Sequence, residues 1–198
     1  MADYQPKDIR NIALLGHGSE GKTTLTESML FAAGHIDRQG RVEDGNTTTD
    51  FDAEENKRGI SINAAAAPVE WKGTKINLID VPGYFDFVGE VMGPVRVVQT
   101  VGIVLNAVNG ITVGAEKAWD MAEKQNLSRM FIVNQMDREN ANFEKVMAAV
   151  NEKFGPSVVP IQLPIMENGA FTGYVDLTSM SARKFEGKAE KEIPIPAG

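Results

Sequence analysis

The run Gly16-His17-Gly18-Ser19-Glu20-Gly21-Lys22-Thr23 constrains this chain more than any other stretch. It fits the pattern G-x-x-x-x-G-K-[ST], after an apolar run (Ile9 to Leu15) and before a helix-prone run (Thr23 to Ala33). In a strand–loop–helix unit of this kind, glycines let backbone N–H groups surround a polyphosphate, and the helix N-terminus adds partial positive charge. We therefore expect residues 16–23, the phosphate-binding loop, to bind a nucleoside phosphate. The alternative is a glycine-rich turn before a helix.

Side chains at three places could complete a nucleotide site. In the loop, Lys22 can reach the β- and γ-phosphates and the Thr23 hydroxyl can bind Mg²⁺. Asp80-Val81-Pro82-Gly83 ends a predicted strand, where Asp80 could contact Mg²⁺ through water and the Gly83 N–H could approach a γ-phosphate. Read alone, this tetrapeptide is equally consistent with a simple turn.

The third place is Asn134-Gln135-Met136-Asp137, at the end of another predicted strand. The Asp137 carboxylate can accept hydrogen bonds from both N1–H and the exocyclic amino group of guanine, a pair that adenine lacks. Asn134 could bridge this segment to the phosphate-binding loop. Alone the segment could be a strand-end turn. In combination with the other two motifs it indicates guanine specificity.

Composition is that of an ordinary globular domain. The chain has 198 residues, 42% hydrophobic content, no cysteine and a formal net charge of −7. The absence of cysteine excludes disulfide partners and a thiolate metal site, and it fits a reducing cytoplasm. Apolar runs are too short to span a membrane, and the first residues lack the apolar core of a signal peptide. The acidic balance argues against broad electrostatic binding of nucleic acid.

Apolar runs alternate with helical patterns, which predicts an α/β fold with a mostly parallel sheet flanked by helices. Expected strands are Asn11–Leu15, Ile60–Val69, Lys75–Asp80, Gly102–Ala107 and Arg129–Asn134. Expected helices are Lys22–Ala33, Phe85–Thr100, Ala115–Gln125 and Phe143–Phe154, the second interrupted at Gly93-Pro94. Trp119 is expected in the core, and His35 is expected to cap the first helix.

Two stretches have a different texture. Residues 36–59 are polar and lack a clear period, which predicts a loop that is either functional or disordered. Its charge cluster, Glu54 to Arg58, is by default a solvated face, and the alternative is an order–disorder transition coupled to nucleotide state. From Pro156 the sequence becomes β-rich, with Phe171 to Asp176 as a strand. We expect a domain boundary near Gly155, with residues 1–155 as the nucleotide-binding domain and 156–198 as the start of a β-rich insert.

The order of these motifs, with Arg58-Gly59-Ile60-Ser61-Ile62 between the first two, resembles the translational GTPases. Within them the chain resembles elongation factor G and its paralogues, through GKTTLTESMLFAAG, DVPGYFDFVGEV, NQMDRENANF and IQLPI followed by FTGYVDL. The resemblance implies a P-loop GTPase domain that binds GTP or GDP with Mg²⁺, docks on the ribosome and hydrolyses GTP. It also implies that the last strand and closing helix of the domain lie outside these residues, so that little activity is expected of them alone.

The resemblance assigns site residues position by position. The nucleotide would be bound by Gly16, His17, Gly18, Ser19, Glu20, Gly21, Lys22, Thr23, Thr24, Asp80, Gly83, Asn134, Gln135 and Asp137. Mg²⁺ would be held by Thr23, Ser61 and Asp80, with Ser61 at a position where the family has threonine. Catalysis would depend on Tyr84, Lys22 and Gly83.

This chain departs from the family pattern at four positions. Tyr84 replaces the catalytic histidine, and a phenol, whose ordinary pKa is about 10, is a poor proton acceptor at neutral pH. Its hydroxyl could still orient the attacking water, because positioning supplies much of the catalysis in phosphoryl transfer. Ser19 replaces an aspartate, Gly18 a branched apolar residue that gates the catalytic water, and Gln135 a lysine that lies along the base.

The departures suggest a divergent elongation factor G-like GTPase whose hydrolysis is slow or differently stimulated. A second interpretation is a nucleotide-responsive switch that docks on the ribosome and hydrolyses little. A third, an ATPase of the wider P-loop class, is disfavoured by Asp137.

Overall fold

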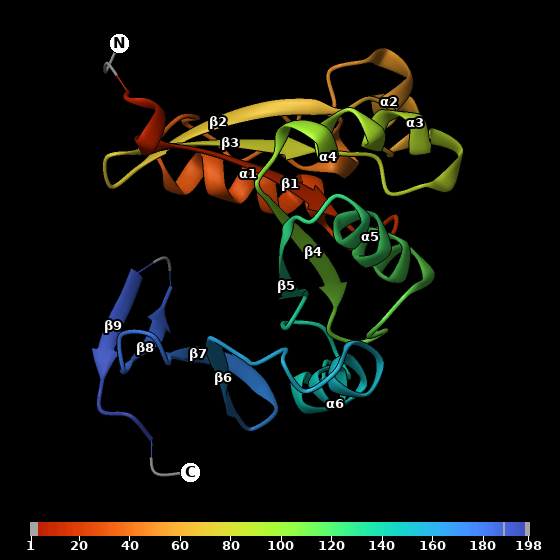
Figure 1. Ribbon diagram of the computed structural model, residues 1–198. Coiled ribbons are helices and arrows are strands. Elements are labelled where there is room, and N and C mark those ends of the chain that lie inside the picture. Colours follow the sequence, from red (N-terminus) through yellow and green to blue (C-terminus); the bar gives the residue numbers. More distant parts are fainter. Residues whose placement is uncertain (1–3, 188, 197–198) are drawn as a thin grey trace.

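The computed structural model describes residues 4–187 and 189–196 and contains two sheets (Figure 1). The larger sheet has the order β2 (Ala65–Trp71), β3 (Thr74–Asp80), β1 (Ile9–Leu15), β4 (Thr100–Asn106) and β5 (Ser128–Asn134). β1, β3, β4 and β5 are parallel, and β2 pairs antiparallel with β3. The predicted mostly parallel α/β sheet is therefore confirmed.

Helices cover both faces of this sheet. Successive strand residues point to opposite faces, so Ile12 packs with α1 (Lys22–Ala32), whereas Ala13 and Leu15 face the other core. That second core contains α5 (Val113–Lys124) and α6 (Phe143–Phe154), which begin at side-chain caps from Thr112 and Asn142. The three predicted helices at these places are confirmed to within two residues at each end.

Trp119 and His35 fulfil their expected roles, core residue and helix cap, only in part. Trp119 is half-buried and stacks on Phe131 and Phe154, with ring centroids 5.4 and 4.5 Å away, so it belongs to the core edge. His35 closes α1 through its backbone N–H, which donates to the Leu30 carbonyl at 2.9 Å. Its side chain instead accepts from the Glu70 N–H on β2.

The predicted strand Ile60–Val69 is wrong in its first half. The sheet begins only at Ala65, because the preceding backbone donors are used elsewhere. The N–H groups of Ile62 and Asn63 donate to the Glu55 carboxylate at 2.9 and 2.8 Å, and the Ala64 N–H donates to Glu90. This arrangement leaves Ser61 in a loop beside the phosphate-binding loop.

The predicted helix Phe85–Thr100 is also wrong as one element. It divides into η3 (Phe85–Phe87), α3 (Val88–Met92) and α4 (Pro94–Val97), and Thr100 already belongs to β4. The expected interruption at Gly93-Pro94 is confirmed, since proline cannot continue the hydrogen bonding of α3.

Residues 36–59 form an ordered connection that contains η2 (Val42–Asp44) and α2 (Ala53–Arg58). Two buried glutamates hold it. Glu27 on α1 accepts from the N–H groups of Gly40 and Thr48, and Glu55, which is fully buried, accepts from the Asp52 N–H at 2.9 Å. The burial of Glu55 therefore contradicts the prediction that the cluster from Glu54 to Arg58 is a solvated face.

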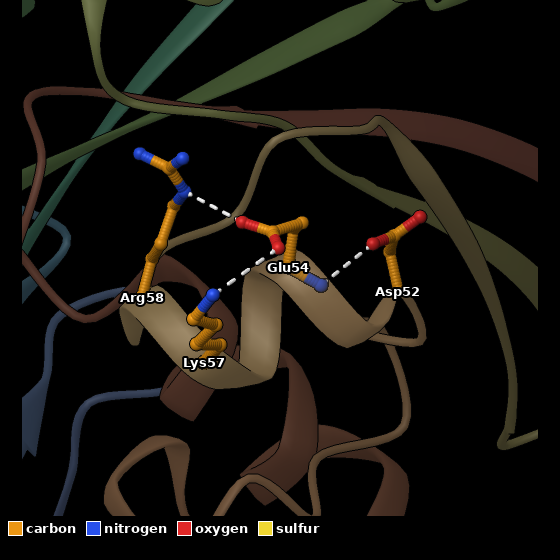
Figure 2. A network of polar contacts seen from close by, with 4 residues as sticks. All are labelled: Asp52, Glu54, Lys57 and Arg58. Atoms are coloured by element: carbon orange, nitrogen blue, oxygen red, sulfur yellow. Dashed lines mark hydrogen bonds and ion pairs between the residues drawn. The ribbon is translucent and has the colours of Figure 1, made fainter.

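The other members of that cluster are on the solvent side. Glu54 pairs with Lys57 and Arg58 at 3.7 and 3.0 Å, and Asp52 accepts from the Glu54 N–H at the helix start (Figure 2). Exposed pairs of this kind contribute little, about 0.3–0.5 kcal/mol each. The solvated reading holds for Glu54, Lys57 and Arg58.

The remaining strands form a separate antiparallel sheet, drawn in blue in Figure 1. Its order is β6 (Gln162–Glu167), β7 (Ala170–Asp176), β8 (Ser181–Glu186) and β9 (Ala189–Ile193). The expected strand Phe171–Asp176 is confirmed as most of β7, while a domain boundary near Gly155 stays a prediction. Short η1 (Pro6–Asp8) precedes β1. Across residues 4–187 and 189–196, every helix is too short or too polar to cross a bilayer.

Candidate nucleotide-binding site

The phosphate-binding loop connects β1 to α1 at the carboxyl end of the parallel strands. β1 pairs with β3 on one side and β4 on the other, so the loop lies where the strand order changes direction. Ligands of open α/β sheets bind at such a point. Gly21 immediately precedes α1 with a φ of 87°, a left-handed conformation that glycine adopts without strain.

Lys22 points back into its own loop. Its Nζ donates to the His17 carbonyl at 2.7 Å and to the Gly16 carbonyl at 3.3 Å, and the side chain is buried. Burial lowers the pKa of this ammonium, and the carboxylates of Asp80, Glu20 and Asp50 oppose that effect. A cation held among loop carbonyls can transfer its hydrogen bonds to a phosphate, a stronger acceptor.

The three predicted Mg²⁺ ligands come together beside Lys22. Thr23 Oγ1 lies 3.0 Å from Ser61 Oγ, Thr49 Oγ1 donates to Asp80 Oδ2 at 2.8 Å, and the Thr23 hydroxyl is near enough to Asp80 to favour its charged form. Burial raises the pKa of Asp80 to about 6. The two threonine hydroxyls and Lys22 oppose that rise, and the Asp50 charge adds to it.

Two oxygens in this cluster suit a divalent cation. Asp80 Oδ1 and Asp50 Oδ1 are buried and have no hydrogen-bond partner among the described residues. Burial raises the pKa of Asp50 too, against hydrogen bonds from Ser61 and Thr47. Unsatisfied carboxylate oxygens next to two hydroxyls form the hard oxygen set that Mg²⁺ prefers. Within the described ranges, no group of three or more His, Cys, Asp or Glu side chains offers a metal site.

The predicted base-binding segment lies against the phosphate-binding loop. Asn134 Nδ2 donates to the Glu20 carbonyl at 2.9 Å, and Gln135 Nε2 donates to the Ser19 carbonyl at 3.0 Å. Gln135 is held in turn by Asn106, whose Nδ2 donates to Gln135 Oε1 at 2.8 Å. Asp137 follows with an exposed side chain.

Glu20 was expected only as a loop member, and its side chain has a role that the pattern did not indicate. It is 2% exposed, and its carboxylate accepts from the His17 N–H at 2.7 Å and from Thr112 Oγ1 at 2.8 Å. Burial raises its pKa, against these two bonds and the charge of Lys22. Because Thr112 also caps α5, the carboxylate ties the phosphate-binding loop to the start of that helix.

The remaining predicted residues also lie at the loop. Gly83 packs so closely against the phosphate-binding loop that a Cβ at this position would lie 2.6 Å from the Gly18 nitrogen. The Tyr84 hydroxyl lies 3.5 Å from Ser19 Oγ. Thr24 is exposed in the first turn of α1. His17 is half-buried, and its Nδ1 has no partner within the described part of the chain.

Sequence reasoning missed several residues that shape the site. They are Thr49, Asp50, Asn106 and Thr112. A weak signal existed for Asp50, which follows three threonines inside the polar segment, and for Thr112, which precedes a helix at a capping position. Thr49 and Asn106 had no local signal, because their contacts span 31 and 29 residues.

Sequence comparisons place this chain among elongation factors. The chain is 40% identical over 190 residues to elongation factor G 2 of Streptomyces coelicolor and 41% identical over 184 residues to elongation factor G 1 of Treponema denticola. It is 38% identical over 193 residues to the mitochondrial ribosome-releasing factor 2 of Culex quinquefasciatus. These matches cover 93–96% of this chain and 26–28% of the relatives, so the chain spans about a quarter of their length.

A solved structure agrees as well. The crystal structure of ttk003000868 from Thermus thermophilus superposes with a TM-score of 0.90 at 37% identity, over 95% of this chain and 28% of that one. The model of the elongation factor Tu GTP binding domain matches residues 7–195. The resemblance drawn from the sequence motifs is confirmed: this chain belongs to the elongation factor Tu GTP-binding domain family.

Proposed function

We propose that this chain is the GTP-binding and GTP-hydrolysing domain of an elongation factor G-like translation factor that acts on the ribosome. The observation that carries the proposal is the hydrogen bond of 2.9 Å from Asn134 Nδ2 to the Glu20 carbonyl. It holds the segment that bears Asp137 against the phosphate-binding loop. One guanine nucleotide can therefore contact both.

The proposal that the ribosome is the partner rests on the names of the relatives. Two are called elongation factor G and one a ribosome-releasing factor, and this chain matches about a quarter of each. We infer that the translation factor to which this domain belongs serves translocation or a related step. We expect it to work in the cytoplasm, although one relative is named as mitochondrial.

Each proposed site residue has one task. Thr23, Ser61 and Asp80 would hold Mg²⁺, which when bound neutralises charge on the phosphates. Lys22 would exchange its bonds to the His17 and Gly16 carbonyls for bonds to phosphate oxygens.

The Gly83 N–H and the Tyr84 hydroxyl would act at the γ-phosphate end. The N–H would donate to the γ-phosphate, and the hydroxyl would orient the attacking water. Both residues lie against the phosphate-binding loop.

Single-turnover GTP hydrolysis by the full-length protein, with and without ribosomes, tests the proposal. We expect binding of GTP in both conditions and faster hydrolysis with ribosomes. Absence of GTP binding would refute the proposal.

A specific observation supports a second function, a nucleotide-responsive docking switch with little hydrolysis. Tyr84, not histidine, follows Gly83, and its hydroxyl lies near Ser19. If Tyr84→His strongly raises turnover, the natural residue restrains hydrolysis and the switch is favoured. If turnover stays the same or falls, the enzyme is favoured.

A further inference from the structure

The glycine at position 18 is explained by a neighbouring ring and not by its backbone. Gly16 and Gly21 have positive φ values of 144° and 87°, whereas the φ of Gly18 is outside that region. The φ of Gly18 therefore does not by itself require glycine. A Cβ there would nevertheless meet three atoms of the Tyr84 ring, Cζ at 2.6 Å, Cε2 at 2.7 Å and Cε1 at 3.0 Å.

We propose that Gly18 and Ser19 form a seat for the Tyr84 ring, and that this seat positions the phenol for the hydrolysis proposed above. Gly18 supplies the space for the outer half of the ring, and Ser19 Oγ lies 3.5 Å from the phenol oxygen. Gly18 and Ser19 are positioning residues in this proposal. It rests on the proposed function, because it assigns a task to the same site.

The seat is fixed from several sides. Ser19 has a left-handed φ of 63°, and its carbonyl accepts from Gln135 Nε2 at 3.0 Å. Glu20, the next residue, is held by Thr112 through its side chain and by Asn134 through its carbonyl. A seat tied to β5 and to the start of α5 resists displacement, so a clash at Gly18 would move Tyr84 and not the loop.

The effect of a substitution at position 18 should therefore depend on which residue stands at position 84. The atoms that a Cβ would strike belong to the far end of the six-membered ring. An imidazole is shorter and has no atom at the place of Cζ. Gly18→Ala should slow GTP hydrolysis when residue 84 is tyrosine and should have little effect on it when residue 84 is histidine.

The experiment is a double-mutant cycle in the full-length protein, with Gly18→Ala, Tyr84→His and the double variant. Readouts are single-turnover GTP hydrolysis with ribosomes, affinity for a fluorescent GDP, and the urea midpoint of unfolding. Gly89→Ala is the matched control, because Gly89 also lacks a positive φ and a Cβ there would meet nothing within 4 Å. Tyr84→Phe keeps the ring and removes the hydroxyl.

We expect Gly18→Ala to slow hydrolysis by about tenfold or more beside Tyr84, since small displacements of positioned groups can cost up to about a hundredfold. Beside histidine the same change should cost less than about twofold. Tyr84→Phe should slow hydrolysis while leaving GDP affinity and the urea midpoint unchanged.

Equal effects of Gly18→Ala in both backgrounds, in hydrolysis and in the urea midpoint, would overturn the seat. Full hydrolysis by Tyr84→Phe would overturn the positioning of the hydroxyl. These outcomes differ from failure of the proposed function, which would appear as absent GTP binding in the unmodified protein.

Discussion

Replacing Asp80 by asparagine should stabilise the nucleotide-free protein at neutral pH. Asp80 is 2% exposed, one of its oxygens lacks a partner among the described residues, and burial raises its pKa from 3.8 to about 6. A raised carboxyl pKa means that the folded state holds the proton more tightly than the unfolded state does. Its stabilising effect is complete below about pH 3.8 and is lost as the pH rises through about 6.

The size of the effect follows from the pKa difference. At about 1.4 kcal/mol per pKa unit, ionising Asp80 in the folded protein costs about 3 kcal/mol at pH 7.5. Asparagine is uncharged and can still accept the hydrogen bond from Thr49 through its amide oxygen. The variant should therefore gain up to about 3 kcal/mol at pH 7.5, and about 2 kcal/mol less than that at pH 4.5.

Urea unfolding at both pH values, without nucleotide or Mg²⁺, measures this gain. A second series with Mg²⁺ and GDP should reverse the order, because the cation that needs the carboxylate then stabilises only the natural protein. A variant that is equally destabilised at pH 4.5 and pH 7.5 would refute the reasoning. A gain that persists with Mg²⁺ and GDP would refute the metal role of Asp80.

Three further changes test other parts of the structure. Glu55→Gln should cost about 2 kcal/mol in urea unfolding, because one buried carboxylate oxygen that accepts from backbone N–H groups would become an amide donor, whereas exposed Glu54→Gln should cost less than about 0.5 kcal/mol. Gly21→Ala should weaken GDP binding, since a Cβ would lie 2.6 Å from Asn134 Nδ2, while Gly73→Ala, with a similar φ of 78° and open space, should not. Trp119→Ala should cost about 3 kcal/mol by unstacking Phe131 and Phe154, and a loss below about 1 kcal/mol would contradict its core role.

The parts of the fold that were predictable from the sequence are those with local signals. The phosphate-binding loop has its own pattern, and the strands that end at Asp80 and Asn134 are apolar runs closed by turn residues. α6 was predictable to the residue because its apolar period and its cap at Asn142 agree.

The parts that were not predictable depend on hydrogen bonds that leave no periodic pattern in the sequence. Glu20, Glu27 and Glu55 are 0–2% exposed, although charged residues in polar segments are normally solvated. Each carboxylate is satisfied by backbone or hydroxyl donors outside its own helix or loop: Glu20 accepts from Thr112, Glu27 from Gly40 and Glu55 from Asn63. The loss of the expected strand at residues 60–64 has the same cause, since Glu55 takes the N–H groups that a sheet would need.

The fit between Gly18 and Tyr84 was not predictable either. The sequence presents a missing side chain and an unusual aromatic residue 66 positions later as separate departures. Only the folded chain brings the ring onto the glycine.

Displacement of a fluorescent GDP by GTP, ATP and XTP tests the central claim most directly, with the natural protein and with Asp137→Asn. GTP should displace the probe at a concentration at least about a hundredfold below that of ATP, because ATP leaves the Asp137 carboxylate without its two donors. In Asp137→Asn, preference should move toward XTP, since the amide can donate to the oxygen that xanthine carries. Equal displacement by ATP and GTP in the natural protein would contradict the account.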